Sequence, residues 1–230
     1  MSGRLTVVAT PIGNLGDLSE RARAALEDAD LVACEDTRRT GALLSHLGIR
    51  KKMVSLHDHN ERQRLPALIA GLETGRSIAL VSDAGTPLLS DPGFLLVREC
   101  AARGIHVEAV PGASAILAAL ITSGLPPYPF TFAGFAPPRA GKRRRFFERF
   151  AALDHTLVFF ESPHRLLPSL EDALEVLGDR PVAVARELTK LHEEVLRGQL
   201  SKVLERLREQ QPRGEYVLVI GSAPASADDA

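Results

Sequence analysis

The first half of the chain alternates short apolar runs with longer segments in which apolar residues recur every three or four positions. The runs suit buried strands and are too short for helices. They occupy residues 5–9, 31–34, 53–56, 78–81 and 107–110. The helical segments cover residues 18–29, 43–47, 65–72, 92–103 and 115–123. Because strands that alternate with helices pair in parallel, this pattern predicts a parallel α/β layer.

A proline-rich segment divides the chain after this layer. Residues 126–129 read Pro-Pro-Tyr-Pro, which excludes a helix and discourages a central strand. We therefore predict an N-terminal domain over residues 1–124, a smaller C-terminal α/β domain over residues 125–221 and a disordered tail over residues 222–230. The second domain is expected to contain strands at 131–135, 156–160, 182–185, 194–197 and 216–220, with helices from 142, at 166–177 and at 200–208.

Composition narrows the class of protein. With 230 residues, 45% of them hydrophobic, the chain can bury one sizeable core or two modest ones. No apolar run is long enough for a membrane span, and the start leads directly into a strand, so we expect a cytoplasmic protein. Cys34 and Cys100 form no metal or disulfide pattern and are expected to be buried and reduced. The net charge of -1 gives no overall nucleic-acid signal.

The candidate site follows the strand at 78–81, where the chain reads Ser-Asp-Ala-Gly-Thr-Pro. Ligands of parallel sheets bind outside the carboxyl ends of the strands, in loops of this kind. Asp83 to Pro87 is therefore the first candidate for a small-molecule site. Asp83 and Asp91 can also be helix caps or turn formers, and this interpretation is preferred for Asp91, which comes just before Pro92.

Other polar residues follow neighbouring strands of the same layer. Residues 35–40 come after the second strand, and they fit either a capped helix or a functional loop. His57 and His59 follow the third strand and supply at most two metal ligands, so a substrate-facing loop is preferred to a metal site. The loop at 10–16 lacks the dinucleotide fingerprint. Residues 111–114 can bring backbone amides close to a ligand, or form a plain turn capped by Ser114.

One segment of the second domain is strongly basic. Residues 139–149 carry six cations and one acid, Glu148. On a helix, Lys142, Arg145 and Arg149 share one face, while Phe146 and Phe150 can dock on the core. Such a surface suits a nucleic-acid backbone, although a solvated basic face without a partner is the alternative. The six cations are Arg139, Lys142, Arg143, Arg144, Arg145 and Arg149.

Several motifs in order along nearly the whole chain resemble one family. They are A-T-P-I-G-N-L-G-D (9–17), E-D-T-R (35–38), S-D-A-G-T-P-L-L-S-D-P-G (82–93), P-G-A-S-A (111–115), F-F-E-S-P-H-R (159–165), A-R-E-L-T-K (185–190) and G-E-Y-V (214–217). Together they resemble the tetrapyrrole-methylase-like enzymes, and among these the bacterial 2'-O-methyltransferases that modify a cytidine in the decoding region of small-subunit (16S) ribosomal RNA.

The resemblance implies a two-domain α/β fold, with a parallel-sheet N-terminal domain and a smaller mixed-sheet C-terminal domain. It also implies a homodimer that binds S-adenosyl-L-methionine between the domains and needs neither a metal nor a membrane. The expected partner is small-subunit ribosomal RNA within the assembled subunit. The cofactor residues carried over from the motifs are Pro11, Asp83, Gly85, Thr86, Pro87, Ser114, Ala115, Ile116, Phe160, Ala185 and Glu215.

The implied reaction mainly requires alignment of a ribose hydroxyl with the methyl group and removal of its proton. Candidates to accept or relay that proton are His57, His59, Asp36, Glu161 and Glu187. Candidates to hold phosphates are Arg38, Arg39, Arg165 and Arg186, with the basic segment as a docking surface for RNA.

Three other functions stay open from the sequence. A small-molecule methyltransferase of the tetrapyrrole type would share the fold and the donor. A ribosome assembly factor without catalytic activity would bind subunits and consume no donor. A metal hydrolase would use His57 and His59.

Overall fold

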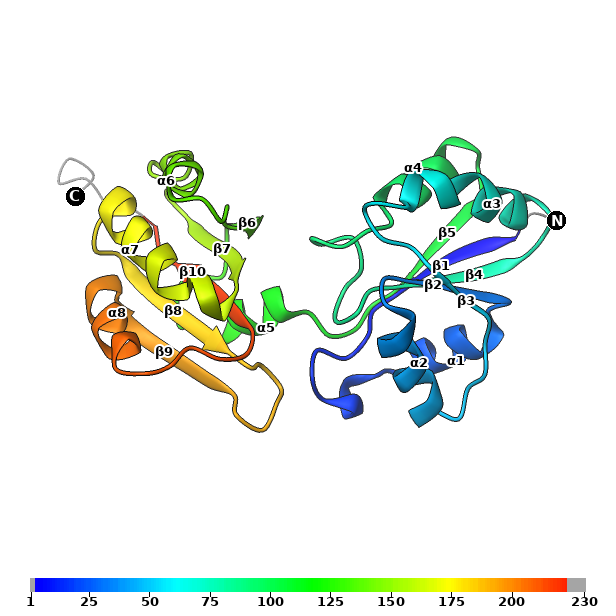
Figure 1. Ribbon diagram of the computed structural model, residues 1–230, viewed down its shortest axis with the longest axis horizontal. Helices are drawn as coiled ribbons and strands as arrows, with labels where there is room; N and C mark the ends of the chain where they lie inside the picture. The colour runs from blue at the N-terminus through cyan, green and yellow to red at the C-terminus, as the bar shows by residue number, and fades with distance from the viewer. Residues whose placement is uncertain (1–2, 223–230) are drawn as a thin grey trace. The chain divides into compact units, whose positions relative to one another are not determined.

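The computed structural model describes residues 3–222 and divides into two compact units, one ending at Ser114 and one beginning at Ala115 (Figure 1). The predicted disordered tail falls, from residue 223 onward, outside the described residues. No helix in residues 3–222 is both long and apolar enough to cross a lipid bilayer.

The first unit contains the predicted parallel sheet, with strands in the order β3-β2-β4-β1-β5. All five predicted strands and the helices between them are confirmed. The strands are β1 (Arg4–Val8), β2 (Leu31–Cys34), β3 (Met53–Ser55), β4 (Ser77–Val81) and β5 (His106–Val110). The helices are η1 (Leu15–Asp17, a 3-10 turn), α1 (Glu20–Asp28), α2 (Thr37–His46), α3 (Glu61–Glu73) and α4 (Phe94–Ala102). Since the strands are parallel, all five carboxyl ends lie at one edge.

Strand β4 shows why this sheet is covered on both faces (Figure 1). Successive side chains of a strand point to opposite faces. Ile78 and Leu80 belong to the core formed with α3 and α4, whereas Ala79 and Val81 belong to the core formed with α1 and α2. A strand buried on both faces must be apolar throughout, which explains the continuous run at 78–81.

The second unit is a mixed sheet in the order β6-β7-β10-β8-β9, in which only β6 and β7 pair in parallel. Helices α6, α7 and α8 cover one face, and α5 packs against β10 and β7 (Figure 1). The strands are β6 (Phe130–Phe135), β7 (Thr156–Glu161), β8 (Pro181–Arg186), β9 (Glu194–Gln199) and β10 (Tyr216–Ile220). The helices are α5 (Ala115–Thr122), α6 (Ala140–Glu148), η2 (Pro163–Arg165), α7 (Leu166–Leu177) and α8 (Leu200–Arg208).

The boundary between the units needs a correction, because α5 belongs to the second unit and not to the first. The units divide after Ser114, before the Gly124 boundary that the proline-rich segment suggested. Arg197 of β9 donates to the carbonyls of Thr122 and Ser123 at the end of α5. The expected linker is also fixed within the second unit, since Thr156 Oγ1 donates to the Pro126 carbonyl at 2.6 Å.

The basic segment forms α6, and two of its cations are structural. Arg143 is only 4% exposed, and its Nε and Nη2 lie 2.7 and 2.6 Å from Asp172 Oδ2 on α7. Arg144 Nε donates to Asp172 Oδ1 at 2.9 Å. The prediction that Arg143 contacts RNA is therefore wrong, because its charge is buried and neutralised inside the second unit. Phe146 is buried as predicted.

Asp172→Ala should destabilise the protein strongly, because it leaves the Arg143 guanidinium buried without its counter-charge. The expected loss in the free energy of unfolding is about 3–5 kcal/mol, measured by urea denaturation. Glu175→Ala removes only the exposed partner of Arg144 and should cost no more than about 1 kcal/mol. Equal losses in the two variants would contradict a structural role for Arg143.

Candidate functional site

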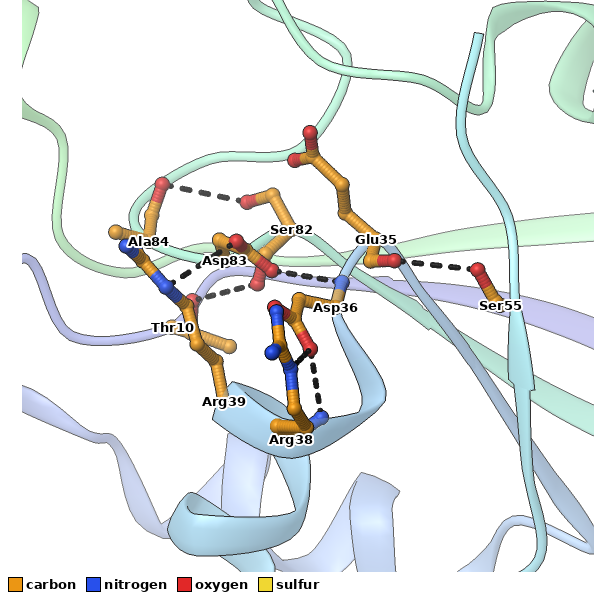
Figure 2. A network of polar contacts seen from close by, with 9 residues as sticks. All are labelled: Thr10, Glu35, Asp36, Arg38, Arg39, Ser55, Ser82, Asp83 and Ala84. Atoms are coloured by element: carbon orange, nitrogen blue, oxygen red, sulfur yellow. Dashed lines mark hydrogen bonds and ion pairs between the residues drawn. The ribbon is translucent and has the colours of Figure 1, made fainter. Parts of the chain in front are cut away.

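The loops after β1 and β4 are joined by two backbone hydrogen bonds at the carboxyl edge of the parallel sheet. Thr10 N donates to Gly85 O at 2.9 Å, and Gly85 N donates to Thr10 O at 3.0 Å. Gly85 has φ of +83°, where a side chain would be strained, and an added Cβ would lie 3.1 Å from Ile12. Thr10 Oγ1 also donates to Ser82 O at 3.4 Å (Figure 2). The loop at 83–87 is therefore fixed against the first loop.

Asp83 ties a third loop to this pair. Its Oδ1 accepts from the backbone amide of Asp36 at 2.9 Å, and its Oδ2 lies 3.5 Å from Arg39 Nε (Figure 2). The carboxylate thus holds the turn after β2 against the turn after β4. Asp83 therefore has a structural role at the centre of the candidate site, and among residues 3–222 the ion pair with Arg39 is the only polar contact of its Oδ2.

Asp36 acts as the cap of α2. Its side chain accepts from the Arg38 amide at 2.8 Å and forms an ion pair with the Arg38 guanidinium at 2.6 Å (Figure 2). Hydrogen bonds from the Arg38 side chain and backbone lower the pKa of Asp36 to about 2. So acidic a carboxyl is a weak base, which argues against the predicted role of Asp36 in accepting a proton.

His57 is oriented by Asn60 in the loop between β3 and α3. Asn60 Oδ1 accepts from the His57 amide at 2.9 Å, so the Asn60 amide nitrogen faces His57 Nε2 at 3.0 Å and donates to it. In the neutral imidazole the proton then lies on Nδ1. This Nδ1 is buried and has no hydrogen-bond partner in the part of the chain described. His57 can therefore donate a hydrogen bond from Nδ1, whereas the lone pair of its Nε2 already accepts the hydrogen bond from Asn60.

Four carboxylates from three loops interact at the same edge: Glu35, Asp58, Asp83 and Asp91. Burial raises the pKa of Asp91 to about 7, and the negative charges of the other three add to the effect. Burial also raises the pKa of Glu35, and the negative charges of Asp83 and Asp58 add to this rise. The positive charges of Arg39 and His57 oppose it but do not cancel it. The edge is therefore a region of concentrated negative charge in which Asp91 is an unusually strong base.

The interpretation of Asp91 as a helix cap is wrong. The cap position of α4 is Gly93, which provides no side-chain hydrogen bond. The first amides of α4 are satisfied by the buried Glu61 of α3, whose Oε1 accepts from Leu95 N at 2.9 Å and Leu96 N at 3.3 Å. Asp91 therefore does not cap α4.

The loop that carries Asp91 contains two residues in an unusual conformation. Leu88 and Ser90 have φ of +75° and +74°, although neither is glycine. Left-handed residues of this kind cost free energy and cluster at functional sites. The strain therefore adds to the functional interpretation of the loop between β4 and α4.

The last loop of the edge, at 111–114, is also attached to the central one, since Thr86 Oγ1 donates to Ala113 O at 3.2 Å. The structure thus brings together the predicted cofactor residues of the first unit, which are Pro11, Asp83, Gly85, Thr86, Pro87 and Ser114. The other predicted cofactor residues lie in the second unit, and they are Ala115, Ile116, Phe160, Ala185 and Glu215. Of these, Ile116 and Ala185 are buried.

Two candidate acids of the second unit are held by hydrogen bonds and ion pairs within that unit. Glu161 is buried, and its Oε1 accepts from Ser162 N at 2.8 Å and pairs with Arg165 at 2.9 Å. Arg165 is thereby neutralised and poorly suited to a phosphate. Burial favours a higher pKa of Glu187, but hydrogen bonds from Lys190 and the Glu215 amide outweigh it and hold that pKa below its usual range.

The sequence did not point to Asn60, Thr10 or Asp91 as parts of this site. Asn60 precedes a helix and looked like an ordinary loop residue, although its position three residues after His57 was a usable signal. Among residues 3–222, no group of three or more His, Cys, Asp or Glu side chains could hold a metal ion.

Comparisons with known proteins agree with this architecture. Two solved structures share the fold over 96% of this chain. Diphthine synthase has a TM-score of 0.74 at 17% identity, with 90% of its chain covered. Uroporphyrin-III C-methyltransferase from Thermus thermophilus, complexed with S-adenyl homocysteine, has a TM-score of 0.65 at 20% identity, with 98% covered.

Sequence relatives are much closer. A protein of Escherichia coli O157:H7 named ribosomal RNA small subunit methyltransferase I is 47% identical over 230 residues, covering 99% of this chain and 80% of that protein. The protein of the same name from Thermotoga maritima is 45% identical over 218 residues, covering 95% and 98%. A family model described as Tetrapyrrole (Corrin/Porphyrin) Methylases matches residues 4–204. The chain therefore belongs to the tetrapyrrole methylase family.

Proposed function

We propose that this protein is an S-adenosyl-L-methionine-dependent methyltransferase that modifies the ribose 2'-hydroxyl of a cytidine in the decoding region of 16S ribosomal RNA, in the bacterial cytoplasm. The main structural support for this activity is that hydrogen bonds hold three loops together around Asp83 and that negative charge is concentrated there. Support for the RNA substrate comes from relatives named for small-subunit ribosomal RNA that align with nearly the whole chain. The decoding-region cytidine and a homodimer are implied by the family resemblance.

The charge of the site suits the proposed donor. S-adenosyl-L-methionine carries a sulfonium and an ammonium group, and both are favoured near carboxylates. Glu35, Asp58, Asp83 and Asp91 supply that potential. The residues that would hold the donor in the first unit are Pro11, Asp83, Gly85, Thr86, Pro87 and Ser114. The second-unit residues Ala115, Ile116, Phe160, Ala185 and Glu215 stay predictions.

The bound donor supplies a methyl group on a good leaving group, so the protein must align the ribose hydroxyl and accept its proton. Among the acids considered, Asp36 and Glu187 are held as weak bases. The lone pair of His57 Nε2 is used by Asn60. Asp91 has a pKa of about 7 and is therefore proposed as the proton acceptor in place of these three residues. His59 and Glu161 stay predictions.

The exposed cations of α6 suit the proposed RNA substrate. Arg139, Lys142 and Arg145 are exposed, and no carboxylate of the described residues forms an ion pair with them. Arg149 lies over the Phe150 ring at 5.5 Å. These four cations form the proposed docking surface for the phosphate backbone, without Arg143 and without Arg144, which is paired with Asp172 and Glu175.

The proposed function predicts transfer of a tritiated methyl group to small ribosomal subunits, recovered after nuclease digestion as 2'-O-methylcytidine. Corrin precursors should receive no label. Label on a base atom would refute the ribose assignment. Label on a tetrapyrrole alone would support the small-molecule alternative, and binding of subunits without transfer would support an assembly factor.

Asp91→Asn should reduce methyl transfer by about 10²–10⁴-fold, because the amide cannot accept the proton. In the unchanged protein the rate of a single turnover should rise with pH through about 7, where Asp91 ionises, and then level off. The variant should lose this titration and should still bind the donor in calorimetry, although more weakly, because one of the four carboxylates is neutralised. Wild-type transfer by Asp91→Asn would exclude Asp91 as the acceptor.

Asp91→Asn should also make the protein more stable above neutral pH. In the folded state the pKa of Asp91 is raised from 3.8 to about 7. The contribution of Asp91 to the stability of the fold is therefore fully present below about pH 4 and is lost as the pH rises through about 7. The variant should therefore match the unchanged protein in melting temperature near pH 4 and exceed it at pH 8. Equal melting temperatures at both pH values would contradict the raised pKa.

Reversing the charge of Arg139, Lys142 and Arg145 to Glu should raise KM for small subunits and flatten its salt dependence, because phosphate contacts are lost. The affinity for the donor should not change. Arg206→Glu, at an exposed position on α8, is the control for a charge reversal away from α6. Equal KM values in the triple variant and the control would contradict the proposal that α6 binds the RNA.

A further inference from the structure

A cavity lies at the lateral edge of the parallel sheet, apart from the carboxyl-edge site. It is formed by the end of α2 and by β3, the outermost strand of the sheet, and its volume is about 420 Å³. Pockets for small ligands have volumes of about 300–1,000 Å³. The cavity is therefore large enough for one ring system.

The floor of the cavity is apolar and its mouth is open. Leu44 and Ile49 are buried beneath it, and Met53 is partly exposed along one side. Methionine adapts its shape to flat and irregular partners. Gly48, two residues after the end of α2, has φ of +72°, and nothing lies within 4 Å of the point where a Cβ would stand. A flat ring could therefore enter without displacing a side chain.

The rim of the cavity is cationic. Arg50 and Lys51 line it, and Lys52 follows them in the chain. None of the three forms an ion pair with a carboxylate of the described residues, whereas the neighbouring Arg23 is paired with Glu27 and donates to Leu47 O. The rim therefore keeps positive charge available for an anion.

An apolar floor beside a free cationic rim fits a nucleotide, whose base is flat and whose phosphate is anionic. A base can enter only if it is unpaired, as in single-stranded segments of RNA. We propose that this cavity binds an unpaired nucleotide flanking the methylated one, with its base on the floor and its phosphate at Arg50 and Lys51. The inference rests on the proposed function, since it takes the RNA substrate as given.

The position of the cavity agrees with such a role. Strand β3 runs from Met53, at the cavity, to Ser55, just before the His57 loop of the candidate site. Three residues of strand span about 10 Å. An RNA strand held at the cavity would therefore need only a short path along the outer edge of β3 to reach the carboxyl edge.

Two variants test the base and the phosphate separately. Ser45→Trp, on the exposed wall of the cavity, fills it without changing charge. The double variant Arg50→Glu and Lys51→Glu reverses the rim. Both should weaken binding of a fluorescein-labelled single-stranded oligoribonucleotide, measured by anisotropy, by about tenfold or more. Only the double variant should reduce the salt dependence.

Arg64→Glu on α3 is the control for a charge reversal away from the cavity and should bind the oligoribonucleotide like the unchanged protein. Circular dichroism and calorimetry with the donor establish that each variant is folded. Wild-type binding by Ser45→Trp would overturn the placement of a base, and wild-type binding by the double variant would overturn the proposal. If the unchanged protein transfers no methyl group to subunits, the proposed function fails, while the anisotropy measurements still decide the cavity.

Discussion

The candidate site depends on how the loop after β4 is held. Two backbone hydrogen bonds join it to the loop after β1, and the Asp83 carboxylate joins it to the turn after β2. These contacts are possible because β4 lies between β1 and β2 in the sheet, so that their carboxyl ends are neighbours. The strand order is therefore the constraint that brings residues distant in sequence into one site.

The sequence predicted the elements well and the tertiary roles less well. The ranges of β2, α7, α8 and β10 agree with the predicted ones, because apolar periodicity records which face of each element is buried. The role of Arg143 could not be predicted in this way. A run of cations does not reveal that Asp172, on another helix, neutralises one of them inside the unit.

The same limit explains the domain boundary and Asp91. Prolines at 126–129 mark a break in regular structure, but only packing shows that α5 belongs with β10 and β7. The sequence before Pro92 favours a cap, yet Glu61 from another helix already occupies that role. Local patterns report local geometry, whereas partners supplied by distant elements decide what a polar side chain does.

The contact between Glu61 and helix α4 also affects His57, although Glu61 and His57 lie on different elements. It opens α3 directly after Asn60, and its carboxylate is fastened to the first amides of α4. Asn60 in turn decides which ring nitrogen of His57 carries the proton. The start of α4 therefore serves as the anchor for the imidazole, so a shift of that helix would be transmitted to a ring with which it shares no hydrogen bond.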